Sequence, residues 1–130
     1  MISDKLQQQL IDAAATARQN AYAPYSNFLV GASLLAEDGS LFSGCNVENA
    51  SYGLTICAER IAIGNAISHG HKKFKAICVV ADNAVSPCGA CRQFIREFGS
   101  ETLIMLVDSN GNQMRKKFTI DQLLPESFSL

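Results

Sequence analysis

The stretch Phe74-Lys75-Ala76-Ile77-Cys78-Val79-Val80-Ala81 is an apolar run with the length of one β-strand. Such a run is typical of a strand that is covered on both faces, because a half-exposed strand would keep alternate positions polar. We therefore expect residues 74–81 to form the central strand of a sheet, with the remaining elements arranged around it.

The segments before this strand predict a helix, a hairpin and a second helix. Ser3 is a suitable N-cap for the first helix, Asp38-Gly39 is a turn pair that fits a tight antiparallel hairpin, and Gly70 is suited to end the second helix. The expected elements are a helix over residues 3–18, strands over 28–36 and 41–47, and a helix over 56–68.

The segments after the central strand predict two further helices and a strand pair. The expected elements are a helix from near Cys88 to Gly99, a strand over 103–108, an Asn110-Gly111 turn, a strand through Phe118, and a helical turn over 119–124 that stops at Pro125. This order predicts a layered α/β domain around one mixed sheet of about five strands. A chain of 130 residues has the usual size of a single domain, so we expect one domain over residues 1–130.

Composition excludes several classes of function. A formal net charge of −1 argues against a protein that holds nucleic acid through many phosphate contacts. Asp4, Lys5 and several glutamines stand where a signal peptide would need an apolar stretch, and no run has membrane length, so we expect a soluble cytoplasmic protein with no membrane partner. Five cysteines are an odd number for a disulfide framework, which favours thiols that serve metal binding or catalysis.

Cys88 and Cys91 form a CxxC unit directly after Pro87, at the expected start of a helix. Free backbone amides and the helix dipole favour thiolates at this position. The unit alone is equally compatible with a redox dithiol, half of a structural zinc site or two unrelated thiols. Cys57 favours a metal, because it also opens an expected helix and is followed by Glu59.

The number of available ligands distinguishes a catalytic zinc site from a structural one, since structural zinc is normally closed by four protein ligands. Other candidates for a fourth ligand are poorly placed: Cys45 and Cys78 within apolar strands, and His69 and His71 about 18 Å along the helix that begins at Cys57. Three cysteines and one carboxylate therefore predict a zinc ion with an open coordination position.

Glu59 follows Cys57 by two positions, which is about 200° around an ideal helix and would turn the carboxylate away from the metal. The two side chains can converge only if Cys57 begins its helix. The same residues match the signature of zinc deaminases, in which His or Cys, any residue and Glu are followed by Pro-Cys-x-x-Cys. Here the matching segments are Cys57-Ala58-Glu59 and Pro87-Cys88-Gly89-Ala90-Cys91.

Segments outside the metal motif extend this match over nearly the whole chain. They are Asn46-Val47-Glu48-Asn49-Ala50-Ser51-Tyr52-Gly53 with Thr55 to Arg60, Pro24-Tyr25-Ser26-Asn27-Phe28 ahead of Val30-Gly31-Ala32, and Leu123-Leu124-Pro125 with Phe128. The chain resembles the small, three-cysteine class of cytidine deaminases. The resemblance implies an α/β/α sandwich, a homotetramer, one zinc ion per chain and a nucleoside substrate.

The resemblance also implies the reaction, which is hydrolytic deamination of cytidine and deoxycytidine to uridine and deoxyuridine in pyrimidine salvage. Zinc-bound hydroxide would attack C4 of the ring, and Glu59 would carry protons from the water to ring N3 and to the departing amino group. Three thiolates leave a net negative site, so a compensating cation is expected.

The residues that the resemblance assigns to substrate and metal surround this centre. Asn46 and Glu48 would hold the ribose, and residues two apart on a strand do face the same way. The remaining assignments are Phe28 against the pyrimidine ring, the Ala58 carbonyl toward the amino group, Tyr52 and Phe128 at a neighbouring subunit's site, and Arg60 as the cation on the thiolates. Gln93 is either a further polar residue around the thiolates or an ordinary exposed helix residue.

Two other interpretations remain open from the sequence. One is a related deaminase that acts on another aminated base, on a nucleotide or on a cytosine-containing antibiotic, although Asn46 and Glu48 argue against nucleotides. The other is a structural zinc or redox CxxC module, which would need a fourth ligand or a reversible Cys88–Cys91 disulfide.

Overall fold

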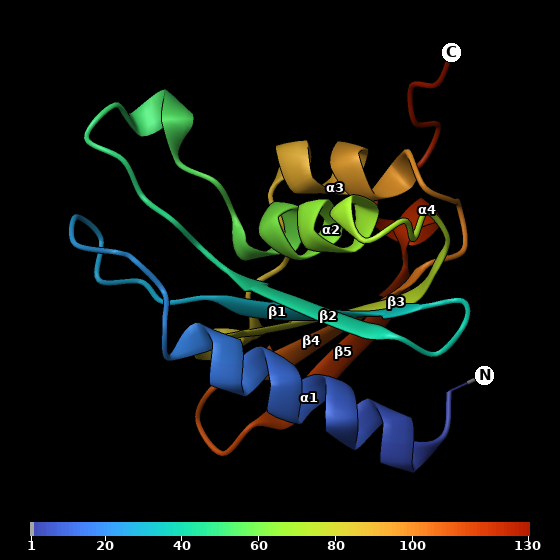
Figure 1. The fold of residues 1–130 in the computed structure, drawn as a ribbon, viewed down its shortest axis with the longest axis horizontal. Helices are drawn as coiled ribbons and strands as arrows, with labels where there is room; N and C mark the ends of the chain where they lie inside the picture. The colour runs from blue at the N-terminus through green and yellow to red at the C-terminus, as the bar shows by residue number, and fades with distance from the viewer. Residues whose placement is uncertain (1) are drawn as a thin grey trace.

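The structure, a computed structural model, describes residues 2–130 and contains one five-stranded sheet (Figure 1). Its elements are α1 (Asp4–Arg18), β1 (Gly31–Ala36), β2 (Leu41–Cys45), the 3₁₀ turn η1 (Tyr52–Leu54), α2 (Ala58–Ser68), β3 (Phe74–Ala81), the 3₁₀ turn η2 (Asp82–Ala84), α3 (Gly89–Arg96), β4 (Leu103–Asp108), β5 (Gln113–Thr119) and α4 (Ile120–Leu123).

The strand order is β2-β1-β3-β4-β5, so the apolar run at residues 74–81 does form the central strand. β3 pairs with β4 in parallel, whereas the β1–β2, β1–β3 and β4–β5 pairs are antiparallel. The sheet is therefore mixed, as expected. Because β1 is antiparallel to both of its neighbours, β2 and β3 run in the same direction and end at the same edge of the sheet.

Helices cover both faces of the sheet and give the expected α/β/α layering. α1 lies against one face, and α2, α3 and α4 lie against the other (Figure 1). Leu10 and Ala14 of α1 pack with Cys78 and Val80 of β3 on the first face. On the second face, Ile63 and Ile95 pack with Ile77, Val79 and Ile104. Among residues 2–130, no helix is long and apolar enough to cross a membrane.

Several element boundaries differ from the expected ones. β1 begins at Gly31 and β2 ends at Cys45, so Phe28 and Val47 lie outside the regular strands. α2 begins at Ala58, and α3 ends at Arg96. The turn residues behave as expected, since Gly39 and Gly70 have φ angles of 95° and 89°, which a residue with a Cβ atom rarely adopts.

Candidate metal centre and active site

The two helices that carry the cysteines begin at the same edge of the sheet. α2 follows β2 and α3 follows β3, and both of these strands end at that edge. Cys57 is the N-cap of α2 and Cys88 is the N-cap of α3, each with an extended backbone. The fold therefore brings two helix N-termini, with their free amides and positive dipole ends, to one place.

Cys57, Cys88 and Cys91 have sulfur atoms that all lie within 4.8 Å of one another. The Cys57 and Cys88 sulfurs are 3.8 Å apart. Tetrahedral Zn–S bonds of about 2.3 Å separate two sulfur atoms by about 3.8 Å, so the donor set fits zinc. Within residues 2–130 this group has no fourth protein ligand, which is the pattern of a catalytic site with one open position.

Hydrogen bonds to sulfur favour the thiolate form of Cys57, whereas the hydrogen bond to Cys57 raises the pKa of the Cys91 thiol. The pKa of Cys57 is lowered to about 5, chiefly because the Cys91 thiol donates to it and also because the Arg60 guanidinium does so. The distance from Arg60 Nη2 to Cys57 Sγ is 3.5 Å. The backbone amide of Cys91 donates to Cys88 Sγ at 3.4 Å. Arg60 thus lies where a cation can offset the negative charge of three thiolates.

Glu59 is the second residue of α2 and its side chain is almost fully buried beside these sulfurs, with 4% exposure. Burial, and to a smaller extent the negative charge at Cys57, raises the pKa of its carboxyl to about 6. Cys57 has a ψ angle of 154°, so it precedes the first helical residue. The 200° separation of an ideal helix does not apply, and the geometric condition set by the sequence is met.

A cavity of about 210 Å³ opens onto this group of residues. Cys57, Glu59 and Cys88 line it together with Ala58, and Phe28 lies on another part of its wall. Most of its remaining wall is apolar, from side chains such as those of Val30, Val79 and Val85. A cavity with apolar walls and a few convergent polar groups is typical of a site for a small organic molecule.

Asn46 also lines this cavity, and its side chain is bound to the chain segment that carries Phe28. Its amide nitrogen donates to the Phe28 carbonyl at 2.8 Å, and its amide oxygen accepts from the Val30 amide at 2.9 Å. Asn46 therefore holds one wall of the cavity in place, a contact that the sequence did not predict.

Glu48 and Tyr52 lie in an adjoining hollow, which shares Thr55 with the cavity. The Glu48 carboxylate accepts from the Tyr25 amide at 2.9 Å and from both the amide and the hydroxyl of Ser26. The Ser26 hydroxyl is the main reason that the pKa of Glu48 is lowered. Tyr52 is 77% exposed and meets Tyr25 edge to face.

Phe128 and Gln93 lie together in a separate hollow near the C-terminus. The Gln93 side-chain amide donates to the Phe128 carbonyl oxygen at 3.1 Å. The bonded partner of Gln93 in this chain is therefore the C-terminal segment, and its expected role around the metal thiolates stays a prediction. The Phe128 ring is 69% exposed.

Arg92 is a residue of the site that sequence reasoning missed. Its Nε donates to the Pro87 carbonyl at 2.9 Å, its Nη2 to the Ser86 hydroxyl at 2.8 Å, and its Nη1 to the Leu123 carbonyl at 2.7 Å. These bonds hold the turn that leads into Cys88. Its spacing of four residues from Cys88 was no clear signal, because Cys88 precedes the helix and the two side chains need not share a helix face.

Fold and site together define an α/β/α metalloprotein with a three-cysteine zinc site and a buried carboxylate beside the open position. A family model described as the cytidine and deoxycytidylate deaminase zinc-binding region matches residues 4–107. The chain belongs to this family.

Individual relatives agree with the family model. A cytidine deaminase from Sporosarcina psychrophila is 49% identical over 125 residues, covering 94% of this chain and 90% of the relative. A cytidine deaminase from Halalkalibacterium halodurans is also 49% identical over 125 residues, covering 94% of this chain and 93% of the relative. The crystal structure of a cytidine deaminase from Burkholderia pseudomallei matches with a TM-score of 0.89 and 45% identity, covering 98% of this chain and all of the other.

Proposed function

We propose that this chain is a zinc-dependent cytidine deaminase that hydrolyses cytidine and deoxycytidine to uridine and deoxyuridine and releases ammonia. The observation that carries the proposal is the buried Glu59 carboxylate beside three cysteine sulfurs, at a cavity of about 210 Å³. The relatives named cytidine deaminase, at 49% identity over nearly the whole chain, support the choice of substrate.

Glu59 is the proton carrier of this reaction. A pKa of about 6 lets its carboxyl both take up and release a proton near neutral pH, which is what a group acting in turn as base and acid requires. Cys57, Cys88 and Cys91 would hold a zinc ion, whose Lewis acidity would make water nucleophilic at this pH. Glu59 then delivers protons to ring N3 and to the departing amino group, while apolar walls limit access of bulk water.

The substrate contacts follow from the family resemblance and from the position of each side chain. Phe28 lies against the pyrimidine ring, and the Ala58 carbonyl accepts a hydrogen bond from the amino group. Asn46 and Glu48 hold the ribose. The cavity wall supports the roles of Phe28, Ala58 and Asn46, and the adjoining hollow supports that of Glu48.

Tyr52 and Phe128 contribute to the active site of a neighbouring subunit in a homotetramer. Phe128 lies in a hollow apart from the cavity of its own chain, which supports a role toward another copy. The reaction belongs to pyrimidine salvage, because it converts one nucleoside into another that can be reused.

Replacement of Glu59 by Gln tests the proposal most directly at the level of chemistry. Gln is nearly isosteric but cannot carry a proton, so we expect the rate of cytidine deamination to fall by about 10²–10⁴-fold. Zinc content should remain at one ion per chain, because Glu59 is not among the three ligands. A zinc-loaded E59Q protein that deaminates cytidine at the wild-type rate would refute the assignment.

A further inference from the structure

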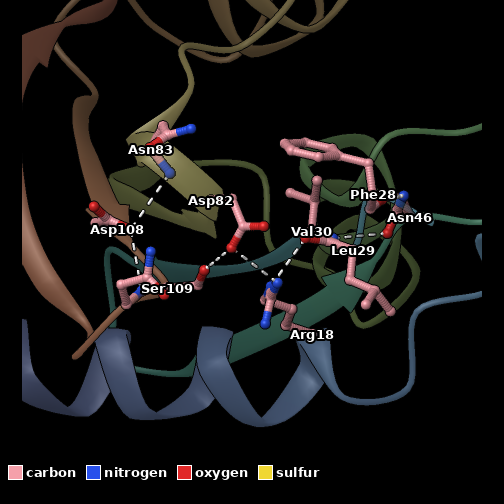
Figure 2. Close-up of polar contacts among 10 residues, drawn as sticks. Arg18, Phe28, Leu29, Val30, Asn46, Asp82, Asn83, Asp108 and Ser109 are labelled. Carbon is pink, nitrogen blue, oxygen red and sulfur yellow. Dashed lines mark hydrogen bonds and ion pairs between the residues drawn. The ribbon is translucent and has the colours of Figure 1, made fainter. Parts of the chain in front are cut away.

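Arg18, the last residue of α1, contacts two separate chain segments whose neighbouring residues form walls of the active-site cavity. Its Nε donates to the Leu29 carbonyl at 2.9 Å, and its Nη2 donates to Asp82 Oδ1 at 3.4 Å (Figure 2). α1 lies on the face of the sheet opposite α2 and α3. One guanidinium from the far layer thus joins segments that are distant in the sequence.

The first wall is the segment from Phe28 to Val30, which precedes β1 and has no sheet partner along most of its length. Its Phe28 and Val30 side chains line the cavity. Asn46 binds the Phe28 carbonyl and the Val30 amide from one side (Figure 2). Arg18 binds the Leu29 carbonyl between them, so the three consecutive residues are each held by a side chain.

The second wall is formed by Val85 and Ser86, which line the cavity and directly follow η2, whose first residue is Asp82. Two residues at the end of β4 hold η2 in place. The Ser109 hydroxyl donates to the Asp82 carboxylate, and the Asn83 amide donates to Asp108 Oδ1 at 3.3 Å. These bonds hold Asp82 in place relative to the sheet. Arg18 bonds both Asp82 and Leu29, and it therefore ties the first wall to the same position.

Gly31 allows Arg18 to make its contacts with Leu29 and Asp82, because it lets the start of β1 approach the end of α1. A Cβ atom at Gly31 would lie 1.9 Å from the Ala14 carbonyl oxygen and 2.6 Å from the Arg18 amide nitrogen. Only glycine permits so close an approach. As a result, the Arg18 side chain starts close enough to reach both walls.

We propose that Arg18, oriented by Asp82, is a positioning residue that sets the separation of the two cavity walls and so places Phe28 against the pyrimidine ring. This role rests on the proposed function, because it presupposes a ring bound next to Phe28. The Arg18 and Asp82 side chains are 26% and 54% exposed. An ion pair so exposed contributes little to the stability of the fold, so we expect a protein without it to stay folded.

The test compares Arg18→Met with Arg96→Met. Met keeps the apolar stem of Arg18 but loses the donors. Arg96 pairs with Asp121 at 3.5 Å and its side chain is 28% exposed, which matches the Arg18–Asp82 pair closely, but it touches neither wall. We expect R18M to raise the KM for cytidine about tenfold with kcat changed less than about threefold, because the wall binds the ring before and during reaction.

Four further measurements distinguish a positioning role of Arg18 from a general loss of structure. R18K keeps one donor and should give a KM between wild type and R18M. Zinc content and thermal unfolding of R18M should match those of R96M. Hydrogen–deuterium exchange at the amides of residues 28–30 should be about tenfold faster in R18M than in wild type and unchanged in R96M.

The proposal is overturned if KM is unchanged in R18M, if exchange over residues 28–30 is unchanged, or if R96M raises KM as much as R18M does. Loss of zinc from R18M would also overturn it, because the effect would then lie in the metal site. A wild-type protein that does not deaminate cytidine would refute the proposed function instead. The exchange comparison would still show whether Arg18 holds the cavity wall.

Discussion

Arg60 is the residue whose charge acts most directly on the three sulfurs, since its guanidinium is 3.5 Å from Cys57 Sγ. In zinc-free protein the pKa of Cys57 lies at about 5, because the Cys91 thiol and Arg60 both donate hydrogen bonds to the thiolate. A cation favours the charged form of a thiol, so its removal must raise the pKa.

We therefore expect Arg60→Gln to move the pH profile for alkylation of Cys57 by iodoacetamide. In zinc-free wild type the rate should rise through pH 5 and level off above it. In R60Q the rise should come about one pH unit or more higher, so alkylation at pH 6 should be slower. Peptide mass spectrometry locates the alkylated residue, and Arg96→Gln is the control. Identical profiles for R60Q and wild type would contradict the account.

The main residues of the site could be predicted because their chemistry is encoded locally. Cys57, Glu59, Cys88 and Cys91 lie in two short segments, and the condition that Cys57 precedes its helix is confirmed by its ψ of 154°. The roles of Asn46, Glu48 and Phe28 toward a substrate came from resemblance and remain predictions.

Arg18 and Arg92 could not be predicted, because each has a partner that is remote in sequence. Arg18 meets Asp82 across 64 positions, and Arg92 meets Leu123 across 31. Nothing in the residues next to either arginine distinguishes it from an ordinary surface arginine at the end or on the face of a helix. Only the packing of separate elements brings the partners together.

At the scale of elements, the contact between α1 and the start of β1 depends on Gly31. A Cβ atom there would collide with the Ala14 carbonyl oxygen at 1.9 Å. The atoms in the way belong to the helix backbone, which cannot move aside as a flexible side chain could. The same substitution at Gly64, in the middle of α2, meets nothing within 4 Å.

We expect Gly31→Ala to lower the free energy of unfolding by about 1–3 kcal/mol, as overpacking does. Gly64→Ala should raise it by about 0.5–1 kcal/mol, because alanine restricts the unfolded chain and favours the helix. Urea denaturation followed by circular dichroism measures both changes. Equal stability of G31A and wild type would show that β1 and α1 can separate without cost.

Element types were predictable from the sequence, but several boundaries were not. The 74–81 strand was predicted to the residue, because its apolar run is sharply bounded and buried on both faces. The strand expected from Phe28 begins instead at Gly31. Residues 28–30 look like a strand because they are apolar. Their backbone groups mostly bind side chains of Asn46 and Arg18, and only the Val30 carbonyl accepts from a backbone amide, that of Asn46.

At the scale of the whole molecule, large apolar side chains on the surface favour the proposed assembly. Tyr52, Leu54 and Phe128 are 77%, 64% and 69% exposed. Aromatic side chains such as Tyr52 and Phe128 are enriched in the cores of protein–protein interfaces. We expect light scattering on the purified protein to give a mass four times the 14.0 kDa of one chain. A monomer mass at all concentrations would contradict the proposed roles of Tyr52 and Phe128.

The α/β/α layering was implied by the family resemblance, and the order of elements in the sequence predicted one mixed sheet. The pairing β2-β1-β3-β4-β5 required the structure, because strand order depends on contacts between distant segments. That order decides the site, since it makes β2 and β3 end at one edge and so brings the N-termini of α2 and α3 together.

The central claim is that this site deaminates pyrimidine nucleosides. The most direct test follows ultraviolet absorbance as purified protein with one zinc ion per chain is mixed separately with cytidine, deoxycytidine, cytidine monophosphate and free cytosine. The account predicts that cytidine and deoxycytidine are converted to uridine and deoxyuridine with one ammonia released for each, and that the monophosphate and free base react far more slowly. Fully zinc-loaded protein that leaves both nucleosides unchanged would contradict it.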